Sequence, residues 1–169
     1  MEEVSLQEML AAREHRVALQ IRLLQQYKKS LISFTLNIPG PVKVPDGVPQ
    51  AFATGCRRIE ALLKDRLVLV QHMETIKEKT GYEAFYCIDA NPEFIKTLMV
   101  TLEDQDRLGR LFDIDVIRPD GSKVSREELG RPSRTCLLCK EPAHACSRSR
   151  RHSVAELTAE IGHILKDLY

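Results

Sequence analysis

Leu108-Gly-Arg-Leu-Phe-Asp-Ile-Asp-Val-Ile117 is the stretch that decides the fold. A strand repeats every two residues, so Asp113 and Asp115 leave the same face of an otherwise apolar strand. Adjacent carboxylates repel each other unless a cation lies between them, and Mg²⁺ is often held by one or two carboxylates together with substrate phosphates. We therefore expect a magnesium-binding, phosphate-handling site here.

The alternative is a half-exposed strand that directs Phe112, Ile114 and Val116 to the core and both aspartates to water. Two observations favour the site. Aspartate is disfavoured in strands, and Arg110 places a permanent cation just before the pair.

Composition limits the classes of protein to consider. The chain has 169 residues, a net charge of +1, 29% charged and 43% apolar residues, which is typical of one globular domain and argues against a generally basic nucleic-acid binder. No run of about 18 apolar residues and no secretion signal is visible, so we expect a cytosolic protein. Five cysteines, an odd number, favour reduced thiols or a metal site over a disulfide framework.

The order of predicted elements favours a mixed α/β (α+β) fold. Residues 31–38, 67–75, 82–89 and the aspartate stretch are typical of strands, and helices are expected at 49–66 and from Asn91-Pro92. This βαββαβ order is that of a ferredoxin-like or palm-type sheet. A single domain over 1–169 then comprises an N-terminal helix (1–29), the sheet core (30–118), a basic Cys/His loop (119–152) and a C-terminal helix (153–169).

Capping signals bound the two terminal helices. Ser5 and Glu8 form a capping box for a helix that runs to about Tyr27, and Ser153 caps the last helix. In the first helix, apolar spacing predicts a packing stripe of Leu6, Met9, Leu10, Val17, Ile21 and Leu24. Its other face is expected to be solvated, with Arg13, Glu14, Arg16, Arg22 and Gln25.

In a sheet of this kind the last strand lies beside the first, so the aspartates are expected to approach residues 35–41. Pro39-Gly40-Pro41 ends the first strand, and Gly40 and Val42 can each donate a backbone N–H to a phosphate there. A Pro-Gly-Pro run is more often only a turn.

A basic segment follows the sheet core. Residues 131–152 contain six arginines or lysines and a single acid, Glu141. Arginines beside a carboxylate strand suit a polyanionic substrate, because they bind phosphates bidentately. The alternatives are a solvated loop or a patch for an acidic partner protein.

The same segment holds the ligand types of a tetrahedral zinc site. Cys136 and Cys139 are well spaced for Zn²⁺, and His144 with Cys146 would complete the set. The His144-x-Cys146 step is short for a zinc module, and His152 is able to replace His144. Buried structural thiols, or a thiolate that contacts substrate, are the other readings.

Several stretches together resemble the CitX family of apo-citrate lyase phosphoribosyl-dephospho-CoA transferases, also called citrate lyase holo-acyl-carrier-protein synthases. They are residues 31–43 (LISFTLNIPGPVK), 109–116 (GRLFDIDV), 131–139 (RPSRTCLLC) and 146–152 (CSRSRRH). The glycine followed by Asp-x-Asp also resembles the signature of the nucleotidyltransferase superfamily. That superfamily usually has Gly-Ser or Gly-Gly before the acids and a third carboxylate on a later strand, and neither is visible here.

The resemblance implies transfer of a phosphoribosyl-dephospho-CoA group from its triphosphoribosyl precursor to a serine of the citrate lyase acyl carrier protein (gamma subunit), with release of diphosphate. It implies that Asp113 and Asp115 hold Mg²⁺ and that Arg110 acts with them. Nucleic acid and membrane are not expected partners. Substrate binding is assigned to Gly40, Lys43, Gly109, Arg134, Arg148, Arg150, Arg151 and His152.

The rival interpretation is a non-catalytic, zinc-stabilised module that binds an acidic carrier protein or nucleic acid. Two carboxylates beside the arginines argue against a nucleic-acid surface, because they repel phosphate unless they are metallated. Aromatic residues make up only 5% of the chain, which leaves few side chains for base stacking.

Overall fold

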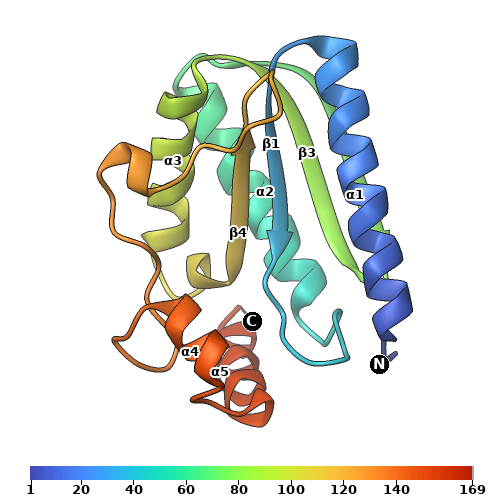
Figure 1. Cartoon of the computed structure of the whole chain (residues 1–169), viewed down its shortest axis with the longest axis vertical. Helices are drawn as coiled ribbons and strands as arrows, with labels where there is room; N and C mark the ends of the chain where they lie inside the picture. Colours follow the sequence, from blue (N-terminus) through green and yellow to red (C-terminus); the bar gives the residue numbers. More distant parts are fainter. Residues whose placement is uncertain (169) are drawn as a thin grey trace.

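The structure is a computed structural model in which residues 1–168 are described (Figure 1). Its centre is an antiparallel sheet of four strands in the order β2-β3-β1-β4. The strands are β1 (Ser30–Leu36), β2 (Leu69–Glu78), β3 (Gly81–Asp89) and β4 (Phe112–Ile117). The mixed α/β class is confirmed, and so is the prediction that the last strand lies beside the first.

Helices cover both faces and one end of the sheet (Figure 1). Helix α1 lies on one face, α2 and α3 lie on the other, and α4 and α5 lie at the end where β1 finishes and β4 begins. The bounds are α1 (Leu6–Tyr27), α2 (Val48–Asp65), α3 (Pro92–Asp104), α4 (Ala143–Ser149) and α5 (Val154–Lys166), with short 3-10 turns η1 (Gly109–Leu111) and η2 (Glu127–Leu129). The predicted C-terminal helix (153–169) included residue 169, which lies outside the described residues.

Alternation along the strands divides the core into two parts. Ile32 and Phe34 of β1 face the larger core under α2, α3 and α5, whereas Leu31 faces the smaller core under α1. The aspartates of β4 follow the same alternation. They lie opposite Thr35 and Ser33, so they are on the α1 face of the sheet.

The capping box of Ser5 and Glu8 begins α1 as predicted, but the predicted packing face is wrong. Of the predicted stripe, Leu6, Leu10, Val17 and Ile21 are exposed and Leu24 is buried. The packing face is formed by Leu24 with Leu19 and Leu23, which the prediction left out. The sheet surface beneath α1 presents Ser33 and Glu83, which Gln20 and Arg16 contact. Polar groups on the sheet therefore turn a polar side of the helix inward.

The stretch that begins at Leu108 enters β4 later than expected, because Gly109–Leu111 forms the 3-10 turn η1. Gly109 is buried against the end of α3, where an added Cβ would collide with the carbonyl oxygen of Leu102 and lie 3.1 Å from that of Glu103. Only glycine allows so close an approach of two backbone segments.

We expect Gly109→Ala to lower the free energy of unfolding by about 1–3 kcal/mol, the usual cost of overpacking, in a urea titration. Gly162→Ala is the matched control, because a Cβ at Gly162 in α5 meets nothing within 4 Å. That control should be neutral or slightly stabilising. Equal unfolding midpoints for the two variants would contradict the packing role of Gly109.

Between β4 and α5, the regular structure consists of the short helix α4 and the turn η2.

None of the helices in residues 1–168 is both long and apolar enough to cross a bilayer.

Candidate functional site

The carboxylates of β4 differ in their surroundings. Asp115 is half-buried, and its Oδ2 accepts from Lys123 Nζ at 3.1 Å, an exposed pair of little energetic weight. The Asp113 side chain is exposed, and within residues 1–168 it forms no hydrogen bond or ion pair. Desolvation, followed by repulsion from Asp115 and Glu103, raises the pKa of Asp113 above its ordinary value. Two like charges side by side are compatible with a bound cation, and the predicted magnesium site stays a prediction.

Asp113 opens into a depression of about 150 Å³ between α1, β1 and the loop after β1. Arg13, Arg16 and Lys43 also line it. The first two were expected to lie on a solvated face. Arg13 is exposed, whereas Arg16 pairs with Glu83 of β3, which also lines the depression. Burial, followed by repulsion from Arg13, lowers the pKa of Lys43, whose Nζ donates to the carbonyl oxygen of Ile38 at 2.8 Å.

Two buried charged residues of α3 hold β4 in place, and sequence reasoning missed both. The Glu103 carboxylate accepts from the backbone N–H of Ile114 at 3.0 Å, and Lys96 Nζ donates to the Ile114 carbonyl oxygen at 2.8 Å. Glu103 also pairs with Arg126 at 2.8 Å and Arg134 at 3.5 Å. Ile114 separates the two aspartates, so these contacts fix the segment that carries them. The sequence contained a signal for them, because Lys96 and Glu103 are seven residues apart and therefore lie on the same face of the helix.

A second depression, of about 630 Å³, lies between the end of the sheet and helices α4 and α5. Asn37 lines both depressions, so they adjoin. Arg110, Arg134, Arg150 and His152 line the larger one. Its lining holds three arginines and no acid, so it could take a polyanion.

These arginines are not equally free. Arg134 donates to the carbonyl oxygens of Phe112 at 2.7 Å and Arg110 at 2.9 Å, so it braces the start of β4. Arg110 donates to the side chain and the carbonyl oxygen of Thr135, and its buried Nε has no partner within residues 1–168. The Arg150 side chain forms no hydrogen bond or ion pair in that range and is available to a ligand.

The other predicted substrate-binding residues are spread more widely. Arg148 and Arg151 are exposed and lie outside the lining of the larger depression. Gly40 adopts φ +81° and packs under α5, with Val154 Cγ1 3.2 Å from the position of an added Cβ. Gly109 uses its N–H on Asp106, at 2.8 Å. Of residues 35–41, which were expected to approach the aspartates, only 35–38 line the depression with Asp113, and Gly40 does not.

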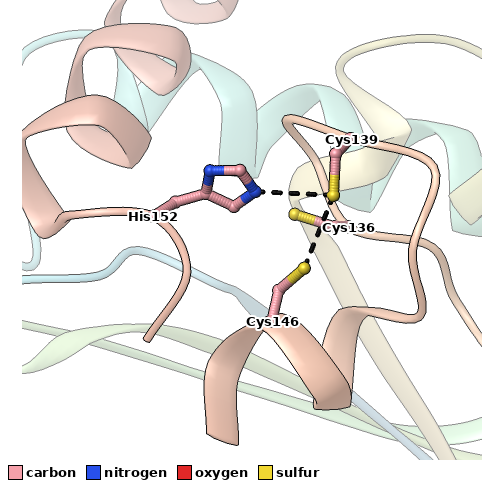
Figure 2. Close-up of side chains that lie close together, drawn as sticks. All are labelled: Cys136, Cys139, Cys146 and His152. Carbon is pink, nitrogen blue, oxygen red and sulfur yellow. Dashed lines mark hydrogen bonds between the residues drawn. The ribbon is translucent and has the colours of Figure 1, made fainter. Parts of the chain in front are cut away.

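Three cysteines and one histidine converge at the edge of the larger depression (Figure 2). The ligand atoms of Cys136, Cys139, Cys146 and His152 all lie within 4.8 Å of one another. His144 is not among them. It is exposed on α4, and residues two apart on a helix point about 200° apart, so His144 and Cys146 cannot face one ion together. The alternative that the sequence offered, His152, takes that place.

Fold and site together define a mixed α/β protein whose edge strand carries a carboxylate pair beside cation-lined depressions. The family model for apo-citrate lyase phosphoribosyl-dephospho-CoA transferase (CitX) matches residues 4–168. The chain belongs to this family, which confirms the resemblance seen in the sequence.

Curated relatives cover nearly the whole chain. A probable apo-citrate lyase phosphoribosyl-dephospho-CoA transferase of Vibrio cholerae is 39% identical over 165 residues, which are 97% of this chain and 93% of the relative. A similarly named protein of Streptococcus pyogenes is 36% identical, with 99% and 88% covered. The transferase of Citrobacter koseri is 34% identical, with 97% and 90% covered.

Proposed function

We propose that this chain attaches a phosphoribosyl-dephospho-CoA group to apo-citrate lyase. The donor is the triphosphoribosyl precursor, the acceptor is a serine hydroxyl of the acyl carrier (gamma) subunit, and diphosphate is released. Family membership supports the reaction class. The protein acts on a small molecule and a carrier protein, with no role for nucleic acid or membrane.

The observation that carries the proposal is the unpaired Asp113 carboxylate next to Asp115, at the edge of a basic depression. A carboxylate with a raised pKa and a like-charged neighbour on the same strand face fits a divalent cation, and we infer Mg²⁺. Such an ion would polarise the phosphate under attack and neutralise charge on the leaving diphosphate. Asp113 and Asp115 would hold it.

The proposed transfer is a substitution at the phosphorus nearest the ribose. The serine oxygen forms a new P–O bond as the bond to the diphosphate breaks, and the hydroxyl proton passes to a carboxylate or to water. Charge spreads over the phosphate oxygens in such reactions, so positioned cations supply most of the catalysis. Arg110 and Arg150 line the larger depression, which supports a role for them in binding the phosphates.

We place the reaction in the cytosol, because all five cysteines are free thiols and three of them lie close together beside a histidine. Reduced thiols are typical of a reducing compartment.

The test is the intact mass of the apo acyl carrier subunit after incubation with this protein, Mg²⁺ and triphosphoribosyl-dephospho-CoA. We expect a gain of one phosphoribosyl-dephospho-CoA unit that disappears with EDTA and returns when Mg²⁺ is restored. A gain that persists in EDTA would contradict the role of the metal. No gain in any condition would contradict the proposed function.

A further inference from the structure

We propose that Cys136, Cys139, Cys146 and His152 bind one Zn²⁺ in a closed, structural site. Nothing in the transfer reaction requires this ion. Cys139 Sγ lies 3.4 Å from Cys146 Sγ and 3.4 Å from His152 Nε2 (Figure 2). Four protein ligands of this kind, three thiolates and an imidazole, make up a common structural zinc set.

The distances agree with a tetrahedron around a metal rather than with a disulfide. Zinc lies about 2.3 Å from sulfur and about 2.0 Å from nitrogen, so the edges of the tetrahedron measure about 3.5–3.8 Å. A disulfide would bring the two sulfurs to about 2.05 Å. The distances from Cys139 Sγ to Cys146 Sγ and to His152 Nε2, 3.4 Å each, are close to these edges, and no pair of the four ligand atoms is more than 4.8 Å apart.

Surrounding groups orient the ligands. Glu156 Oε2 lies 3.5 Å from His152 Nδ1, on the opposite side of the ring from Nε2, which faces Cys139 Sγ. A carboxylate behind a metal-binding histidine is a frequent arrangement, because it fixes the ring and makes the ligating nitrogen more basic. The backbone N–H of Leu138 is directed at Cys136 Sγ at 3.4 Å and stabilises a thiolate there.

The cluster joins three pieces of chain. A narrow loop supplies Cys136 and Cys139. It is closed by a hydrogen bond from the Cys136 N–H to the backbone carbonyl oxygen of Glu141, at 2.7 Å, and by an isolated β-bridge between Thr135 and Pro142. Helix α4 supplies Cys146, and His152 comes directly before Ser153, the N-cap of α5. A long segment with short helices gains stability from a metal that ties it together.

The ion would also fix one wall of the larger depression, because Cys136, Cys146, Arg150 and His152 all line it. This consequence rests on the proposed function, since only a substrate in that depression would sense the wall. Zinc binding itself does not, so the two ideas fail separately.

The first test measures metal in the full-length protein, expressed with zinc and purified without chelator. Elemental analysis is expected to give one zinc per chain, and a mercurial thiol reagent should release it to an indicator dye. Protein that holds no zinc and that, after reduction, takes up none from a zinc titration would overturn the proposal.

The second test separates the ligands from their neighbours. Cys139→Ser and His152→Ala should lose zinc, whereas His144→Ala and Cys87→Ser should keep it, because His144 is exposed on α4 and Cys87 lies under α1. Trypsin is expected to cut metal-free protein faster at Arg148, Arg150 and Arg151. Zinc retained in His152→Ala but lost in His144→Ala would refute the ligand set.

Discussion

Asp113→Asn and Asp115→Asn are each expected to slow transfer to the carrier by on the order of 10²-fold or more, the usual scale for losing a pre-organised electrostatic contact. Asparagine keeps the size of the side chain but removes the charge that would hold Mg²⁺. The measurement is the initial rate of modified-carrier formation by mass spectrometry at saturating Mg²⁺. Asp65→Asn, at an exposed carboxylate at the end of α2, is the control and should react like the wild type.

Asp113→Asn is expected to lose activity without losing stability. The pKa of Asp113 is raised in the folded state by desolvation, so its ionised form at neutral pH weakens the fold relative to the unfolded chain. The variant should therefore be at least as stable as the wild type at pH 7. The difference should vanish below about pH 4, where the unfolded-state Asp is also protonated. A strongly destabilised variant would mean that the lost activity reports unfolding.

Glu103→Gln should have the largest effect on stability. Glu103 is almost fully buried and pairs with Arg126 and Arg134. A neutral amide leaves Arg134 without a carboxylate partner and Arg126 with only the half-exposed Asp104. Breaking such a pair typically costs about 3–5 kcal/mol. For a chain of this size the melting temperature should fall by on the order of 10 °C, which calorimetry or circular dichroism would show.

Asp104→Asn is the matched control for Glu103→Gln. Asp104 also contacts Arg126, at 3.2 Å, but its side chain is half exposed and its pair is screened by water. We expect a loss below about 1 kcal/mol. If both variants melt together, the buried network does not hold β4 as described.

Local signals predicted the elements well. The capping box at Ser5 and the Asn91-Pro92 start of α3 act through nearby backbone groups, so the sequence contains the whole cause. The packed face of α1 was predicted wrongly because its cause is distant. Ser33 and Glu83 lie on strands that the helix meets only after folding.

In the candidate site too, the features set by local sequence could be predicted and those set by distant packing could not. That Asp113 and Asp115 share a face follows from the period of a strand, and their place beside β1 follows from the element order. The choice between His144 and His152 needed the helical phase of α4, a helix too short to detect by periodicity. Arg13 and Arg16 reach the depression through the docking of α1, which the spacing of their neighbours does not reveal.

The side chains that hold β4 also decide how the sheet can associate with other chains. The open edge of a sheet is a template for a foreign strand, but the outward backbone groups of β4 are already used by Lys96, Glu103, Arg134 and the N–H of Val124. The opposite edge, β2, is interrupted by a bulge between Val70 and His72 and carries charged side chains. Growth of the sheet by strand addition is thus opposed at both ends, by occupied hydrogen bonds at one and by irregular backbone at the other.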